Sequence, residues 1–183
     1  MRRGPAAAIV RKPMKTPALL AAFLLAGAAA SAHAQAAPFA PPEGDFSVAF
    51  PGPPSAHAAP AKRMSDVAYR RYVDQERDRA FIVDVAAYPE GDLPPSPDGA
   101  IYDRLMRSHA DEDSSKLVST RAARLAGRPC LEGTFTDPQG NIEVMRVLMV
   151  GDRIFKLSYA YADGVEDPAA PAAFFSSFKL TAP

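Results

Sequence analysis

The feature that most limits the fold is an alternating pattern near the C-terminal end of the sequence. Every second residue from Phe155 to Tyr161 is aromatic or leucine, which is the period of a β-strand that buries one face. Residues 141–150 alternate in the same way, and only Gly151 and Asp152 separate the two segments. A two-residue loop of this kind is typical of a tight β-hairpin. The sequence therefore predicts a hairpin whose first strand has these residues on one face, interrupted by Arg146: Ile142, Val144, Leu148 and Val150.

Other strand segments also pair along the chain. Residues 67–75 and 80–88 flank a charged turn, and Phe81, Val83 and Val85 share one face of the second segment. Asp137-Pro138-Gln139-Gly140 has the composition of a turn, so it joins the strands on either side of it. The predicted strands are residues 45–50, 67–75, 80–88, 117–125, 130–136, 141–150 and 153–161, whereas residues 55–63 are interpreted as a loop.

Two helices are predicted between and after these strands. Ser96 is expected to cap the first helix, with Pro97 at its first position and Asp98 in its first turn. Asp167-Pro168 opens the second helix, which places Phe174 and Phe178 four residues apart. Strands outnumber helices and are joined mostly by hairpins. The predicted class is therefore α+β, with a central antiparallel sheet of about six or seven strands flanked by two or more helices.

The N-terminal segment has the three parts of a secretory signal peptide. Lys12 and Lys15 supply positive charge, residues 18–30 form a short apolar core, and Ala32-His33-Ala34 offers small residues to a signal peptidase. Cleavage is expected after Ala34, with Ala36 as the alternative. The predicted organisation is a signal peptide over residues 1–34, with Met14 as an alternative start, a flexible Pro/Ala-rich lead-in over residues 35–44, and one α+β domain over residues 45–183.

The signal features favour a bacterial periplasmic or secreted protein. No cysteine follows Leu25-Ala26-Gly27, so lipoprotein processing is excluded. An apolar core of this length is shorter than the roughly 20 residues of a membrane span, so no stable membrane insertion is expected after cleavage.

Charge and cysteine content bear on which partners and cross-links the protein can have. The chain has 21 basic and 21 acidic residues, and five of the basic ones precede residue 43, where no acid occurs. The folded part is thus acidic, which argues against a nucleic-acid partner. Cys130 is the single cysteine, so no intramolecular disulfide forms and the residue is interpreted as a small core residue. A monomer is expected.

Three segments resemble the PsbP-like (Mog/PsbP) proteins. They are the opening strand Phe46-Ser47-Val48-Ala49-Phe50-Pro51-Gly52-Pro53-Pro54, the hairpin segment over residues 151–157 and the closing segment over residues 174–180. With the order of strands between them, the resemblance covers most of residues 45–181. It implies a central antiparallel sheet flanked by helices, in a family of small exported or scaffolding proteins without a shared catalytic centre. Photosynthetic members support a metal-containing complex, but the matched motifs are structural and transfer no functional residue.

The mature sequence contains no complete catalytic or metal-binding motif. Only His57 and His109 remain after cleavage, and His109 is expected to face solvent near the end of the first helix. His109 and Asp111 would need a serine to form a triad, and no Gly-x-Ser-x-Gly turn is present. No His/Cys cluster has the spacing of a metal site. The sequence predicts no catalytic, metal or cofactor residue, and no cofactor.

Residues 111–115 imitate the start of a calcium-binding loop, with Asp111, Asp113 and Ser115 as the first three ligands. The sixth position is Lys116 instead of glycine, and the twelfth is Ala122 instead of glutamate. A solvated acidic loop is the favoured interpretation.

The arginines of the first hairpin and most of the tyrosines remain as candidate surface features. Arg70, Arg71, Arg77 and Arg79 are interpreted as a charged outer face, neutralised by nearby acids: Asp66, Asp74, Glu76 and Asp78. Five of the six tyrosines are candidates to line a groove for a peptide or small ligand, although tyrosines at strand spacing more often pack with the hydroxyl at the rim. These are Tyr69, Tyr72, Tyr88, Tyr159 and Tyr161.

The function that these observations favour is an exported, periplasmic, non-catalytic binding or accessory module, whose partner is an envelope protein or complex. The alternative is a periplasmic hydrolase whose residues converge only in the fold. A cleft that holds His109 with a hydrogen-bonded acid and an exposed hydroxyl would favour the enzyme. A tyrosine-lined or apolar surface without such a cluster would favour the module.

The export prediction has a direct test. The mature protein should be soluble without detergent and should begin at Gln35 or Ala37. Intact mass spectrometry of the exported form measures this, and a protein that keeps its N-terminal segment in the membrane fraction would contradict it.

Overall fold

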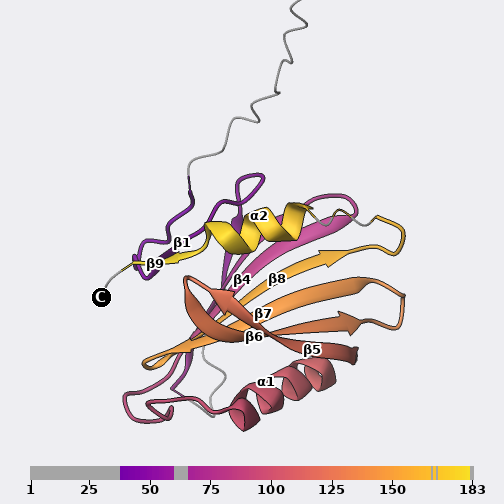
Figure 1. Cartoon of the computed structure of the whole chain (residues 1–183). Helices are drawn as coiled ribbons and strands as arrows, with labels where there is room; N and C mark the ends of the chain where they lie inside the picture. The colour runs from indigo at the N-terminus through magenta and orange to yellow at the C-terminus, as the bar shows by residue number, and fades with distance from the viewer. Residues whose placement is uncertain (1–37, 60–65, 166, 168, 182–183) are drawn as a thin grey trace, which may run out of the picture. The chain divides into compact units, whose positions relative to one another are not determined.

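The computed structural model describes residues 38–59, 66–165, 167 and 169–181. The predicted signal peptide lies outside them. Within this part of the chain, seven strands form one antiparallel sheet in the order β2-β3-β4-β8-β7-β6-β5 (Figure 1). The strands are β2 Ser55–Ala59, β3 Ala68–Gln75, β4 Arg79–Ala87, β5 Lys116–Leu125, β6 Arg128–Thr136, β7 Ile142–Val150 and β8 Arg153–Tyr161. The predicted α+β class with a six- or seven-stranded antiparallel sheet is confirmed.

The pairing of β4 with β8 joins the two halves of the sheet. All the other pairs in this seven-stranded sheet are between strands that follow one another along the chain, whereas β4 and β8 are separated by a helix and three strands. The register places Phe81 opposite Tyr159 and Val83 opposite Leu157. The alternating apolar residues that predicted both hairpins therefore meet on one face at the centre of the sheet.

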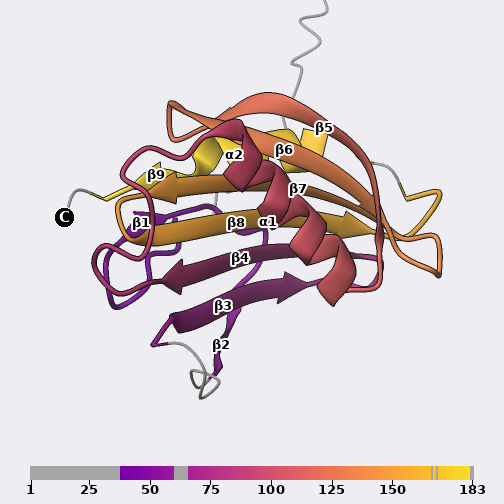
Figure 2. The same ribbon diagram turned by 90° about the horizontal axis from the view of Figure 1, so that it is seen from below.

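Two helices cover opposite faces of this sheet (Figure 2). Helix α1, Gly99–Glu112, packs Met106 among buried residues of β6, β7 and β8. Helix α2, Ala169–Ser177, packs Phe174 and Phe175 on the other face. Asp167 caps α2, because its Oδ1 accepts hydrogen bonds from the backbone N–H groups of Ala169 and Ala170 at 3.1 and 3.3 Å. We call these two surfaces of the sheet the α1 face and the α2 face.

An aromatic cluster on the α2 face holds the two ends of the domain together. Strand β1, Phe46–Ser47, pairs with β9, Lys179–Leu180, at the other end of the described chain. The Phe46 ring stacks on Phe178 at 5.6 Å between centroids and contacts Phe155 edge-on at 6.2 Å. Residues 38–44, in the predicted lead-in, also contact this cluster, because Phe39 bridges to Val48 and its ring lies 5.1 Å from that of Tyr72.

The α1 face has an apolar cluster of its own that leaves no room for a side chain at Gly133. A Cβ atom there would lie 2.9 Å from Met106 Sδ and from the Phe135 ring. Met145, Val147 and Met149 of β7 also point to this face and are buried. The alternation in the sequence predicted burial of only the other face of β7. The alternation of large apolar residues on both faces shows that helices cover both.

Three predicted boundaries are corrected by the structure. Residues 55–59 are a strand, β2, because they pair with β3 from Ser55 opposite Val73 onward. The cap of α1 is Asp98 instead of Ser96, since its Oδ1 accepts a hydrogen bond from Ile101 N at 3.0 Å. The predicted strand over residues 45–50 is shorter, although Phe46, Val48 and Phe50 are all buried as its alternation implied.

No helix in the described part of the chain has the length and apolarity needed to cross a membrane.

Burial predicts different responses to two substitutions. Phe155 is 2% exposed, and truncation of a buried phenylalanine costs about 3–5 kcal/mol. Arg77 is exposed in the β3–β4 turn, where a charge change usually stays within about 0.5 kcal/mol. Phe155→Ala should therefore lower the urea midpoint strongly and Arg77→Ala should barely change it. Equal midpoints for the two variants would refute this assignment of faces.

Candidate functional site

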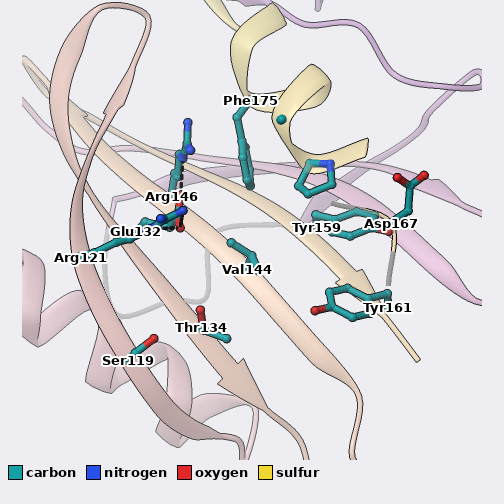
Figure 3. A pocket seen from close by; sticks show the side chains of 12 residues that line it. Ser119, Arg121, Glu132, Thr134, Val144, Arg146, Tyr159, Tyr161, Asp167 and Phe175 are labelled. Atoms are coloured by element: carbon teal, nitrogen blue, oxygen red, sulfur yellow. Dashed lines mark hydrogen bonds and ion pairs between the residues drawn. The ribbon is translucent and has the colours of Figure 1, made fainter. Parts of the chain in front are cut away.

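The candidate site is a groove of about 460 Å³ on the α2 face, beside the helix (Figure 3). A volume of this size is within the range of small-ligand sites. Strands β5 to β8 provide the floor and α2 provides a wall through Phe175. The groove exists because α2 has only nine residues and packs Phe174 against Phe81 and Phe50. The part of the α2 face over β5, β6 and β7 is left without a helix.

Strand register arranges the floor into rows that run across the sheet. One row is Ser119–Thr134–Val144–Tyr159, each residue directly opposite the next on the neighbouring strand. The adjacent row is Arg121–Glu132–Arg146. Side chains directly opposite one another on a sheet interact. The floor therefore has a charged row next to a row of hydroxyl and apolar groups.

Glu132 lies at the centre of the charged row and is 4% exposed. Its Oε1 accepts a hydrogen bond from Arg121 Nε at 2.6 Å, and its Oε2 accepts one from Arg146 Nε at 2.8 Å. Burial alone would raise the pKa of Glu132, but the bonds from the two guanidinium groups outweigh it and hold this pKa below the ordinary value. Glu132 is thus an ionised carboxylate with a cation on each oxygen.

Arg146 connects the floor to the wall. Its guanidinium carbon lies 4.4 Å from the centroid of the Phe175 ring, and its Nη1 donates a hydrogen bond to the Arg124 carbonyl at 3.0 Å. A cation over an aromatic face is attracted by the negative face of the ring. Arg146 therefore holds α2 and the end of β5 in fixed positions on either side of the groove.

Two tyrosines and an ion pair form the other end of the groove. The rings of Tyr159 and Tyr161 stack with centroids 5.2 Å apart. Asp167 lies beside them and pairs with Arg79 Nη1 at 3.3 Å. Burial raises the pKa of Tyr159 despite the nearby Arg79, so its hydroxyl keeps its proton.

These groups are suited to binding and poorly suited to proton transfer or nucleophilic attack. Both oxygens of Glu132 are occupied by arginines, and its lowered pKa keeps it ionised. The Arg121 side chain is 74% exposed at the rim and presents its guanidinium to the groove. What the groove offers is a cation, hydroxyl groups and aromatic rings.

A solved structure shares the architecture of this domain. A solved structure of cyanobacterial PsbP (CyanoP) from Synechocystis sp. PCC 6803 aligns with a TM-score of 0.56 over 79% of this chain and 92% of that chain, at 13% sequence identity. The chain has a PsbP-like fold. Neither a family model nor a curated protein sequence matches the chain. The resemblance expected from the three motifs is confirmed for the fold, and an identity this low carries no function.

The five candidate tyrosines of this PsbP-like domain do not meet in one groove. Tyr159 and Tyr161 line the groove beside α2, while Tyr72 faces the same side but is buried against Phe39 and Phe46. Tyr69 and Tyr88 lie on the α1 face, where both border a separate cavity. The charged row was not identified from the sequence. Its one signal was Arg146, which interrupts an otherwise apolar alternation.

His109 is a clear correction, because it is buried instead of facing solvent. It is 6% exposed, and its ring meets that of Phe135 edge-on at 4.9 Å between centroids. Its Nε2 lies 2.9 Å from Glu143 Oε2, and its Nδ1 lies 3.4 Å from Asp113 Oδ2. The last turn of α1 packs over β6 and β7, and this packing covers the ring.

His109, Asp113 and Glu143 bring three metal-ligating groups within 4.8 Å of one another. The contacts of the two carboxylates, however, are with different ring nitrogens, which point to opposite sides of the imidazole. One ion could not replace both contacts. Burial alone would raise the pKa of Glu143, yet His109 holds it below the ordinary value. The cluster is therefore best explained as a polar bridge that fastens α1 to β7.

The partners of the first-hairpin arginines also differ from those predicted. Arg70 pairs with Glu43 and Asp45 at 2.7 and 2.5 Å, and Arg71 pairs with Asp84 at 2.7 Å. Within the described part of the chain, Glu76 is the one predicted acid that forms an ion pair with one of these arginines, Arg79, at 2.5 Å. Asp74 instead accepts a hydrogen bond from the Gly52 backbone N–H at 2.6 Å. The acids that pair with Arg70 and Arg71 come from other segments.

Cys130 is buried in the α2-face cluster, as predicted. Burial raises the pKa of its thiol to about 11, so the group is protonated at neutral pH and is a poor nucleophile. His57, the other histidine that remains after the predicted cleavage, is exposed in β2 beside Ser55.

The charged row predicts how stability depends on pH. The pKa of folded Glu132 lies below its ordinary value of 4.5, so this stabilisation is present above pH 4.5 and is lost as the pH falls through the lower value. Glu132→Gln should cost about 1.5–3 kcal/mol at pH 7, the range for a hydrogen bond to a charged group. The same variant should lose less stability than the natural protein on acidification.

Urea unfolding between pH 7 and pH 3 measures this, with Glu90→Gln in an exposed loop as the control. An unchanged stability of Glu132→Gln at pH 7, or an acid dependence equal to that of the control, would contradict the assignment.

Proposed function

We propose that this chain is an exported, periplasmic, non-catalytic binding module that docks an envelope protein in the groove beside α2. The observation that carries the proposal is the charged row in which Arg146 and Arg121 hold Glu132 between them. This row fixes the wall and floor of an open groove and leaves the Arg121 guanidinium exposed at its rim. A pre-formed groove with a polar rim and aromatic lining is suited to recognition.

The alternative, a hydrolase, has less support. His109 does have a hydrogen-bonded acid in Glu143, which is one part of what an enzyme would need. The nearby hydroxyl is that of Ser158, which interacts with Glu143 and is 3% exposed. A general base and its nucleophile must reach the substrate. His109 and Ser158 are both buried, so a substrate does not reach them and they stabilise the fold on this account.

The export part of the proposal rests on the sequence of the N-terminal segment. Its positive charges, apolar core and Ala32-His33-Ala34 site are the three parts of a signal peptide. Fractionation of cells that produce the full chain should place the shortened protein in the periplasm. Recovery of an uncleaved chain in the cytoplasm would refute this part alone.

A matched pair of variants tests the docking site. Ser119 and Thr120 are adjacent, exposed residues of β5, and only Ser119 lines the groove. Ser119→Trp should fill the groove without loss of a buried contact, and Thr120→Trp places the same bulk on the other side of the strand. The mature protein and both variants would be used for affinity capture from the envelope fraction, after thermal unfolding has shown that all three fold.

The expected result is a stoichiometric partner that the natural protein and Thr120→Trp retain and that Ser119→Trp loses. Capture of the same partner by all three proteins would move the docking site elsewhere. The absence of any stoichiometric partner would overturn the proposed function.

A further inference from the structure

Strand β5 is an open edge of the sheet beside the groove. It lies at the end of the strand order, spans ten residues, and among the described residues pairs only with β6. The outer side of an edge strand presents backbone N–H and C=O groups in the spacing of a strand, and extended peptides bind such edges by adding a further strand. A bulge between Leu117 and Ser119 interrupts the first part of β5. The regular edge is therefore residues 119–125.

The charges of β5 indicate what would pair with this edge. The strand contains Lys116, Arg121 and Arg124 and no acidic residue. Two copies of β5 side by side would bring these cations together, and like charges on neighbouring strands are destabilising. A second copy of this chain is thus a poor partner for the edge, whereas an acidic segment is complementary.

The groove side of β5 also favours an acidic side chain in the added strand. A strand added next to β5 would place one side chain directly opposite Arg121, as a continuation of the row Arg121–Glu132–Arg146. Arg121 is 74% exposed although it pairs with Glu132, so its guanidinium is accessible to that side chain. A carboxylate at this position would extend the alternation of charges along the row. The neighbouring side chain on the same face would lie next to Ser119, at the open end of the groove.

We propose that residues 119–125 of β5 bind an extended acidic segment of the partner protein by strand addition, with a carboxylate of that segment on Arg121. This inference rests on the proposed function and names the chemistry of the partner. Backbone hydrogen bonds supply affinity in this mode, and alternate side chains supply specificity. Side chains two residues apart lie on the same face of an added strand, so one carboxylate lies on Arg121 and the next side chain on that face lies beside Ser119, over the groove.

The test uses a synthetic nine-residue peptide of alternating glutamate and threonine with blocked ends, added to the mature protein. Its control is the same peptide with alternate backbone amides N-methylated, which keeps the side chains but removes donors needed for strand addition. Amide hydrogen exchange, read residue by residue, should slow at least tenfold within residues 119–125 with the first peptide and remain unchanged with the control.

Two arginine variants separate the charge from the backbone contribution. Arg121→Gln should weaken binding of the peptide at least tenfold, because it removes the cation at the groove rim. Arg107→Gln makes the same change of charge on the exposed side of α1 and should leave binding of the peptide unchanged. The exchange of β5 in the free variants shows whether the strand itself is still formed.

Three results would overturn the inference: equal binding of the N-methylated peptide, protection of β2 at the other edge instead of β5, or protection of β5 that rises with protein concentration in the absence of peptide. These results leave the proposed function intact if Ser119→Trp still abolishes capture of the envelope partner. Failure to capture any partner refutes the proposed function instead, whatever the peptide does.

Discussion

The stacking of Phe46 on Phe178 is the contact on which the arrangement of the α2 face depends. It joins β1 to β9 and puts both ends of the described domain on Phe155 of the central strand, β8. Because Phe178 follows α2 directly, this contact also fixes where the helix lies. A helix of nine residues cannot reach from there across seven strands, since it is only about 14 Å long at 1.5 Å per residue. The uncovered part of the face over β5, β6 and β7 is the groove, so the candidate site is a consequence of how the chain ends pack.

Each helix is fastened to the sheet by apolar packing and by one charged group from β7. On the α1 face, Glu143 of β7 meets His109 in the last turn of the helix. On the α2 face, Arg146 of β7 lies under Phe175 and is held in turn by Glu132. Partly buried charges such as these cost free energy unless they are paired, and removal of one partner leaves the other unsatisfied. These two charged residues of β7 therefore help to hold each helix on the sheet, and the row that contains Arg146 also shapes the groove.

The sequence predicted those parts of the fold that depend on residues close together in the chain. Alternating apolar residues and tight turns located the β3–β4 and β7–β8 hairpins, and the three motifs indicated the PsbP-like fold. Strand β2 was missed because its residues, Ser-Ala-His-Ala-Ala, contain no large apolar side chain, and it forms only by pairing with β3. Non-local contacts account for the other differences. The burial of His109 needs Glu143, 34 positions away, and the partners of Arg70 come from residues 43 and 45. The groove combines four strands and a helix, so the alternation that identified Tyr159 and Tyr161 could not show which tyrosines share a face with it.

The central claim is that a partner binds the part of the α2 face that α2 leaves uncovered. Site-specific photocross-linking in living cells tests it most directly. A benzophenone side chain at Thr134, on the groove floor, should give one discrete cross-linked product in the envelope. The same group at Asp103, on the exposed side of α1, should give none. Cross-linking from Asp103 with none from Thr134 would contradict the account and would place the partner on the opposite face of the sheet.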